Sequence, residues 1–114
     1  MKTTVEILKA ARDLIAKPEN WTQGEYARGP DGTPFIEVVT EATCFCIIGA
    51  VAKAMVCPVL EADRSEAVRL LVDAAEASTP SELTIFNDES THSEVLDIFS
   101  KAISSAEEKQ GAAS

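Results

Sequence analysis

The sequence predicts a mainly α-helical fold, with about four principal helices packed around a buried central helix over residues 41–57. Three observations lead to this prediction. Apolar residues recur at the three-and-four spacing of a helix face, capping patterns precede several of these segments, and residues 41–57 are apolar on nearly every side. The length of 114 residues suits one domain, expected over residues 1–108, with a frayed tail over 109–114.

Three further segments carry an apolar face, and each follows a capping pattern. The first has a capping box at residues 3–6 and is expected to form a helix over residues 4–17, ended by a proline. The second follows the polar residues 63–66 and ends before a Ser-Thr-Pro sequence. The third begins with a capping box at residues 91–94 and has the most regular apolar stripe. That stripe consists of Val95, Leu96, Phe99, Ala102, Ile103 and Ala106.

Residues 21–26 have the pattern of a short helix. With Thr22 as the N-cap, Glu25 falls at the third helical position and completes another capping box. Trp21 and Tyr26 then occupy the two positions of a hydrophobic staple. We therefore expect at most about two helical turns here, with the Trp21 ring packed against Tyr26 rather than open to a ligand.

Two short segments favour β structure. Residues 35–39 are mostly apolar and β-branched, and residues 83–86 alternate between apolar and polar side chains before an Asn-Asp turn signal. The sequence therefore predicts that these two segments pair as a short two-stranded ribbon beside the helices.

Charge is unevenly distributed along the chain. The whole chain has 10 Lys and Arg against 19 Asp and Glu, a net charge of −9. Residues 1–57 carry six basic and seven acidic side chains, net −1, whereas residues 58–114 carry four and twelve, net −8. Such an acidic half lacks the basic surface that binds nucleic acid or an anionic membrane. It suits a protein partner with a basic surface.

The sequence favours a cytoplasmic location. The N-terminal segment contains charged residues where a secretory signal would be apolar, and no apolar run approaches the ~20 residues that span a bilayer. Three cysteines, an odd number, indicate reduced thiols rather than a disulfide framework.

The three cysteines and the single histidine could form a reactive or metal-binding set. Cys44, Cys46, Cys57 and His92 would suffice numerically for tetrahedral zinc, but residues two apart on a helix point away from each other. No metal and no cofactor is therefore expected. We expect Cys46 to lie in the core. The alternative is a thiol enzyme that uses Cys44 or Cys46 as the nucleophile. In that enzyme His92 would be the base, and Asn87 or Asp88 would orient its imidazole. His92 itself is expected to be an exposed helix-start residue.

Several short patterns occur in a fixed order along residues 4–106. They are Trp21-Thr22-Gln23-Gly24, Ala27-Arg28, Asp31-Gly32, Cys46-Ile47-Ile48-Gly49-Ala50, Asn87-Asp88 and Glu94-Val95-Leu96 with Phe99 and Ala102. In this order the chain resembles a family of short bacterial and phage proteins known only as a domain of unknown function. It departs from that family at Phe86, where the family usually has Trp. The resemblance implies a bacterial or phage setting and no particular activity.

Two functions remain open at this point. The first is a small acidic accessory protein that acts without catalysis by binding a basic protein partner, and the second is the thiol enzyme described above. The residues that match the family pattern form the candidate site, although folding explains them equally well. These residues are Trp21, Gly24, Cys46, Asn87 and Asp88.

Overall fold

The computed structural model describes residues 2–29, 34–35 and 42–113, of which 67% are helical. The predicted fold class, mainly α with a small antiparallel β element, is confirmed. The helices are α1 (Thr4–Leu14), the 3₁₀ turn η1 (Pro18–Asn20), α2 (Ile47–Met55), α3 (Val59–Ala62), α4 (Glu66–Ala74), α5 (Pro80–Glu89) and α6 (His92–Ala113). The strands are β1 (Ala27–Arg28), β2 (Pro34–Phe35) and β3 (Cys44–Phe45).

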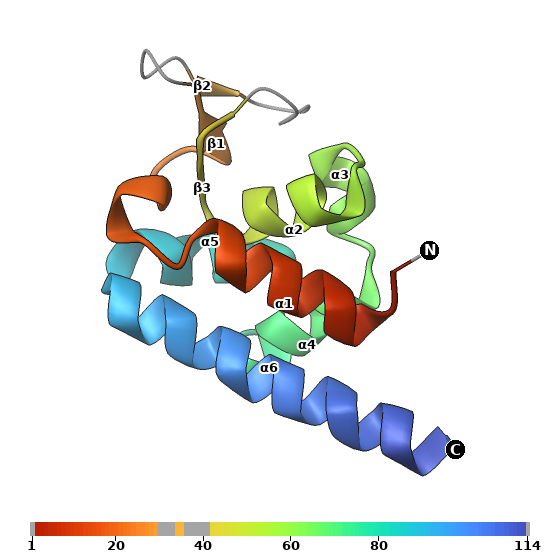
Figure 1. Ribbon diagram of the computed structural model, residues 1–114. Helices are drawn as coiled ribbons and strands as arrows, with labels where there is room; N and C mark the ends of the chain where they lie inside the picture. Colours follow the sequence, from red (N-terminus) through yellow and green to blue (C-terminus); the bar gives the residue numbers. More distant parts are fainter. Residues whose placement is uncertain (1, 30–33, 36–41, 114) are drawn as a thin grey trace.

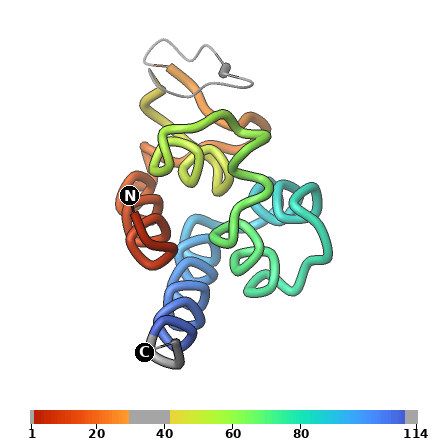
Figure 2. The backbone as a smooth tube through the Cα atoms, turned by 90° about the vertical axis from the view of Figure 1, so that its right-hand side faces the viewer, coloured from red at the N-terminus to blue at the C-terminus, as the bar shows by residue number. Residues whose placement is uncertain are grey.

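Helix α2 is the predicted central helix, and its residues 47–52 are all buried. Helix α1 packs on α2 and on α6, and α6 packs also on α4, so these helices enclose one core. Figure 1 shows α6 running beside α1 in the opposite direction, with the strands at the far end of the molecule. The tube view in Figure 2 shows that the C-terminal part of α6 extends beyond the other helices.

Helix α1 begins as predicted and ends earlier. The Thr3 hydroxyl accepts a hydrogen bond from the Glu6 amide, and the Glu6 carboxylate accepts one from the Thr3 amide. The helix ends at Leu14 rather than at residue 17, because Pro18 forces an extended backbone on the residue before it and itself opens η1.

Helix α2 is shorter than the predicted 41–57 segment. Cys44 and Phe45 are in strand β3, and the extended residue Cys46 is the N-cap. The helix ends at Met55, and the C-cap residue Val56 has a left-handed backbone with φ of 55°. Residue 41 lies outside the described part of the chain.

The β element has different strands from those predicted. Strand β1 pairs antiparallel with both β2 and β3, in the order β2-β1-β3. The predicted strand 35–39 is described only at residue 35, and its predicted partner 83–86 lies in helix α5. The helix forms because Thr79 caps the Glu82 amide and a proline occupies the first turn, which the alternating pattern did not reveal.

Helices α4 and α6 also start at caps. The Ser65 hydroxyl accepts from the Val68 amide, and Thr91 and Glu94 form the predicted capping box. The predicted stripe of α6 faces the core, where Phe99 is fully buried. The helix continues to Ala113, although we expected a frayed tail from residue 109.

Candidate functional site

Asn87, in the last turn of α5, is the only buried polar residue among the described residues. Its Oδ1 accepts hydrogen bonds from the Trp21 indole Nε1 at 2.8 Å and from the Ile47 amide at 3.1 Å. Its Nδ2 donates to the Thr22 carbonyl at 3.0 Å and to Asp88 Oδ1 at 3.2 Å. A side-chain amide can make two bonds at its oxygen and two at its nitrogen, so Asn87 has no capacity left for a ligand.

The loop before β1 also holds the C-terminal end of α5. The Gln23 side-chain amide donates to the carbonyls of Asn87, Asp88 and Ser90 at 3.0–3.1 Å. The Gly24 amide donates to Asp88 Oδ1 at 2.8 Å. Carbonyls at the end of a helix have no partner within the helix, and Gln23 supplies one. We call Asn87, the residues hydrogen-bonded to it, and Gly24, which is bonded to Asp88, the Asn87 cluster. Its members are Trp21, Thr22, Gln23, Gly24, Ile47, Asn87 and Asp88.

These contacts explain why the predicted helix over residues 21–26 is wrong. The Thr22 amide donates to the Phe45 carbonyl, and Gly24 has a φ of +82° that a helix does not allow. The Trp21 ring lies against His92, with ring centroids 5.6 Å apart. The backbone and side chains of this segment thus bond to distant parts of the chain, and the local capping pattern had no means of showing this.

Cys46 is buried beside the Asn87 cluster. Its Sγ accepts a hydrogen bond from the Gly49 amide at 3.4 Å, and its amide donates to the Tyr26 carbonyl at 3.0 Å. A Cβ at Gly49 would lie 1.9 Å from the Tyr26 oxygen, so only glycine allows the loop to approach α2 this closely. Burial raises the pKa of the Cys46 thiol to about 12. The thiol is therefore protonated and inert near neutral pH.

The proposed thiol–histidine pair receives little support from the geometry. His92 is half-buried, not exposed as predicted, because its ring packs on Trp21 and its Nε2 lies 2.6 Å from the Ile15 carbonyl oxygen. The Cys44 thiol donates to the Glu19 carbonyl at 3.2 Å. Each group thus bonds to a main-chain oxygen. Within the described chain, no three His, Cys, Asp or Glu residues are grouped as metal ligands.

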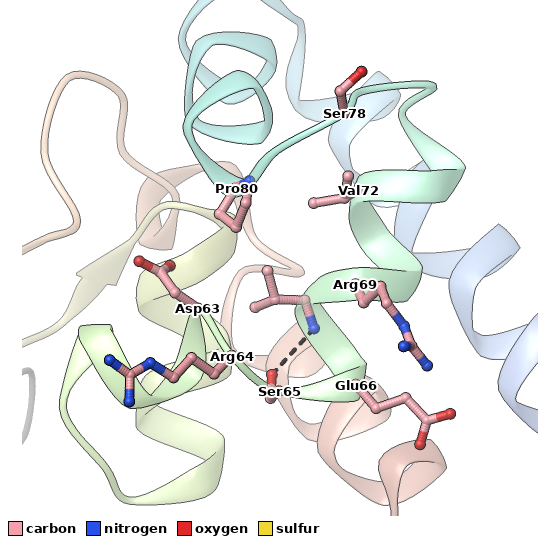
Figure 3. A pocket seen from close by; sticks show the side chains of 9 residues that line it. Asp63, Arg64, Ser65, Glu66, Arg69, Val72, Ser78 and Pro80 are labelled. Atoms are coloured by element: carbon pink, nitrogen blue, oxygen red, sulfur yellow. Dashed lines mark hydrogen bonds between the residues drawn. The ribbon is translucent and has the colours of Figure 1, made fainter.

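Sequence reasoning missed the two cavities beside the N-terminal end of α5. The larger, about 460 Å³, lies between α4 and the residues that lead into α5 (Figure 3). A smaller one of about 280 Å³ adjoins it, and both are lined by Asp63 and Pro80. Asp63 closes α3, and we had considered it only as part of a capping sequence. No local pattern marks it, because its surroundings come from three separate segments.

Most carboxylates in the acidic half of the chain are exposed. Residues 70–100, here called the acidic stretch, contain seven carboxylates and no Lys or Arg. All seven are exposed, and among the ion pairs of the described residues only Asp97 with Lys101, 3.4 Å apart, involves one of them. The seven are Asp73, Glu76, Glu82, Asp88, Glu89, Glu94 and Asp97.

Comparison with known families matches residues 1–105 to the family of unknown function DUF6197. The chain belongs to this family. The match spans α1 through most of α6 and thus contains the Asn87 cluster and both cavities. Comparisons with curated proteins and with solved structures gave no match. The described helices include none that is long and apolar enough to cross a bilayer.

All five candidate residues of the family pattern meet in one region of this DUF6197 chain. Trp21, Asn87 and Asp88 are joined directly by hydrogen bonds, Gly24 bonds to Asp88, and Cys46 precedes the Ile47 amide that Asn87 holds. Their mutual hydrogen bonds fix the loop before β1, the start of α2 and the end of α5 to one another. These hydrogen bonds account for the five residues as contributors to the fold, and their role as a site stays a prediction.

Proposed function

We propose that this DUF6197 protein acts without catalysis, as a small acidic accessory protein that binds a basic protein partner in the cytosol of a bacterium or of a phage-infected cell. The observation that carries the proposal is the acidic stretch. Its seven carboxylates are all exposed, and among the ion pairs of the described residues only the one between Asp97 and Lys101 involves one of them. Free cysteines at positions 44, 46 and 57 suit a reducing compartment.

The charges of the acidic stretch are not explained by stability alone. Asp88 and Glu89 lie in the last turn of α5, where the helix dipole favours cations, and no basic residue lies in that turn. Asp88 accepts the Gly24 amide, but no such contact accounts for Glu89. A hydrogen bond from an amide leaves the charge of a carboxylate in place. Local rules are most often broken where function requires it, which favours a role for this surface in binding.

Binding to nucleic acid is disfavoured by the same surface. Phosphates are repelled by exposed carboxylates, whereas a basic protein is attracted to them and its association is accelerated. A protein partner that itself binds nucleic acid would present the required cations.

The proposal is tested by fluorescence anisotropy with a labelled arginine-rich peptide that contains no acidic residue. We expect binding at low salt, weakened about tenfold when Asp73→Asn, Glu76→Gln and Glu89→Gln are combined, since exposed ion pairs contribute about 0.2–1 kcal/mol each. The control combines Asp13→Asn, Glu19→Gln and Glu108→Gln, which are equally exposed and change the net charge by the same amount.

An equal loss in both triple variants would show that only net charge matters and would contradict a defined binding surface. Absence of binding by the unmodified protein at low salt would contradict the proposal as a whole.

The thiol enzyme is the second proposal, and its chemistry is separately testable. Because the pKa of Cys46 is raised to about 12, we expect this thiol to react slowly with iodoacetamide in the folded protein and quickly after unfolding. Mass spectrometry of the labelled peptides distinguishes the three cysteines. Fast labelling of Cys44 or Cys46 at neutral pH in the folded protein would favour the enzyme instead.

A further inference from the structure

Asp63 has a buried oxygen without a partner. Its Oδ1 is inaccessible to solvent and accepts no hydrogen bond within the described chain. The ion pairs of the described residues do not include Asp63. Figure 3 shows the guanidinium groups of Arg64 and Arg69 directed away from its carboxylate. Burying a carboxylate oxygen without a bond is costly, and each such case in a folded protein requires an explanation.

The smaller cavity, here called the Asp63 cavity, surrounds Asp63 with mainly apolar side chains. It is lined by Asp63 together with Tyr26, Ile48, Pro80, Thr84 and Ile85, and no Lys or Arg lines it. Ile85, a residue of α5, is 55% exposed and adds apolar surface to this lining. Its volume of about 280 Å³ is below the ~300–1,000 Å³ typical of small-molecule sites.

We propose that the Asp63 cavity receives one arginine side chain of the basic protein partner, an inference that rests on the proposed function. The aliphatic part of the arginine would lie along Ile48, Pro80 and Ile85. Its guanidinium would pair with the carboxylate of Asp63, which lines the cavity together with Tyr26 and carries the unpartnered Oδ1.

Arginine fits this cavity better than lysine does. A guanidinium is more weakly hydrated than an ammonium group, pairs with a carboxylate through two parallel bonds, and stacks on aromatic rings. Asp63 and Tyr26 line the same cavity, and burial and then the charge of Asp63 raise the pKa of the Tyr26 phenol. Burial also raises the pKa of Asp63, because it disfavours the charged carboxylate, and a cation bound beside it would offset this effect.

The larger cavity, which Asp63 also lines, suits the same cation less well. Its lining combines the two cations of Arg64 and Arg69 with the carboxylates of Asp63 and Glu66, whereas no Lys or Arg lines the Asp63 cavity. In the Asp63 cavity a guanidinium therefore meets a carboxylate without a competing cation in the lining. The exposed acidic residue Glu82, in the first turn of α5, lies beside Ser81, which also lines the Asp63 cavity.

The cavity is tested by NMR with N-acetyl-arginine methylamide, which carries the arginine side chain on a neutral backbone. We expect saturable chemical-shift changes at Asp63, Tyr26, Thr84 and Ile85. They should disappear in Asp63→Asn, which loses no protein contact of Oδ1 and is expected to fold. The citrulline derivative, equally long but uncharged, should leave these signals unchanged. Unchanged signals with the arginine derivative, or the same changes in Asp63→Asn, would overturn the proposal.

The arginine-rich peptide separates this inference from the proposed function. We expect Asp63→Asn to weaken peptide binding about tenfold, the effect of losing one charged hydrogen-bond pair, and Asp73→Asn, with the same charge change on the exposed face of α4, to weaken it much less. Equal effects in the two variants would overturn the proposal that the Asp63 cavity binds an arginine. They would leave the proposal of an acidic binding surface unaffected. Binding of the arginine derivative at Asp63 without binding of the peptide would overturn the surface alone. A lysine peptide that binds Asp63 as tightly would overturn the preference for arginine.

Discussion

Asn87 shows at the scale of one residue how this chain joins segments far apart in sequence. One side chain fixes the indole of Trp21, the carbonyl of Thr22 and the first amide of α2, at separations of 40 to 66 residues. Because it is fully buried and fully bonded, its replacement leaves several polar groups without partners in the interior. The sequence pattern includes this residue, and its hydrogen bonds in the structure suit a role in holding the fold together.

Replacing Asn87 by alanine should be strongly destabilising. The Ile47 amide and the Trp21 indole lose their acceptor, and each unsatisfied buried donor costs about 1–3 kcal/mol, so we expect a loss of about 2–5 kcal/mol. Urea denaturation followed by circular dichroism measures it. The control Gln23→Ala removes bonds at an exposed side chain and should cost about 1 kcal/mol. Equal losses in the two variants would contradict the role given to Asn87.

Gly49→Ala should destabilise the protein by about 3 kcal/mol or more. The added Cβ would overlap the Tyr26 carbonyl oxygen at 1.9 Å, and backbone on both sides must move to relieve this. In Gly24→Ala, the matched control, the Cβ meets no atom within 4 Å, and only the φ of +82° opposes it, at about 1–2 kcal/mol. A thermal midpoint for Gly49→Ala at or above that of Gly24→Ala would refute the close approach.

At the scale of the elements, sequence predicted best where capping and periodicity agree. The capping boxes before α1 and α6 are both present, and the fully apolar segment contains the buried helix α2. The predictions for two segments were wrong, each for a physical reason. In residues 21–26 long-range hydrogen bonds replace the local cap, and in residues 83–86 a brief alternation of apolar residues is outweighed by the Thr-Pro start of α5.

Thr79→Ala tests the start of α5. The hydroxyl accepts the Glu82 amide at 3.2 Å, and loss of such a cap costs about 1 kcal/mol. Ser81→Ala, in the same turn and exposed, should change the unfolding free energy by a few tenths of a kcal/mol at most. If the two variants unfold at the same urea concentration, the cap contributes nothing and the helix start needs another explanation.

At the scale of the whole molecule, the interior and the surface differ in the groups they contain. The interior joins α2, α5 and the loop before β1 through hydrogen bonds, several of them made by Asn87. The surface carries the negative charge, and all seven carboxylates of the acidic stretch are exposed. The candidate residues were predictable from the sequence because they are local patterns. Asp63 and its cavities were not, since they arise only when α3, α5 and the segment at Tyr26 come together.

The central claim is that binding depends on the charge of this surface, and the salt dependence of the dissociation constant tests it most directly. The Debye length falls from about 30 Å at 0.01 M salt to about 3 Å at 1 M, so charges on an exposed surface are progressively screened. For the unmodified protein and the arginine-rich peptide, we predict an affinity that falls steadily as sodium chloride is raised across this range. An affinity that does not change with salt would contradict the claim.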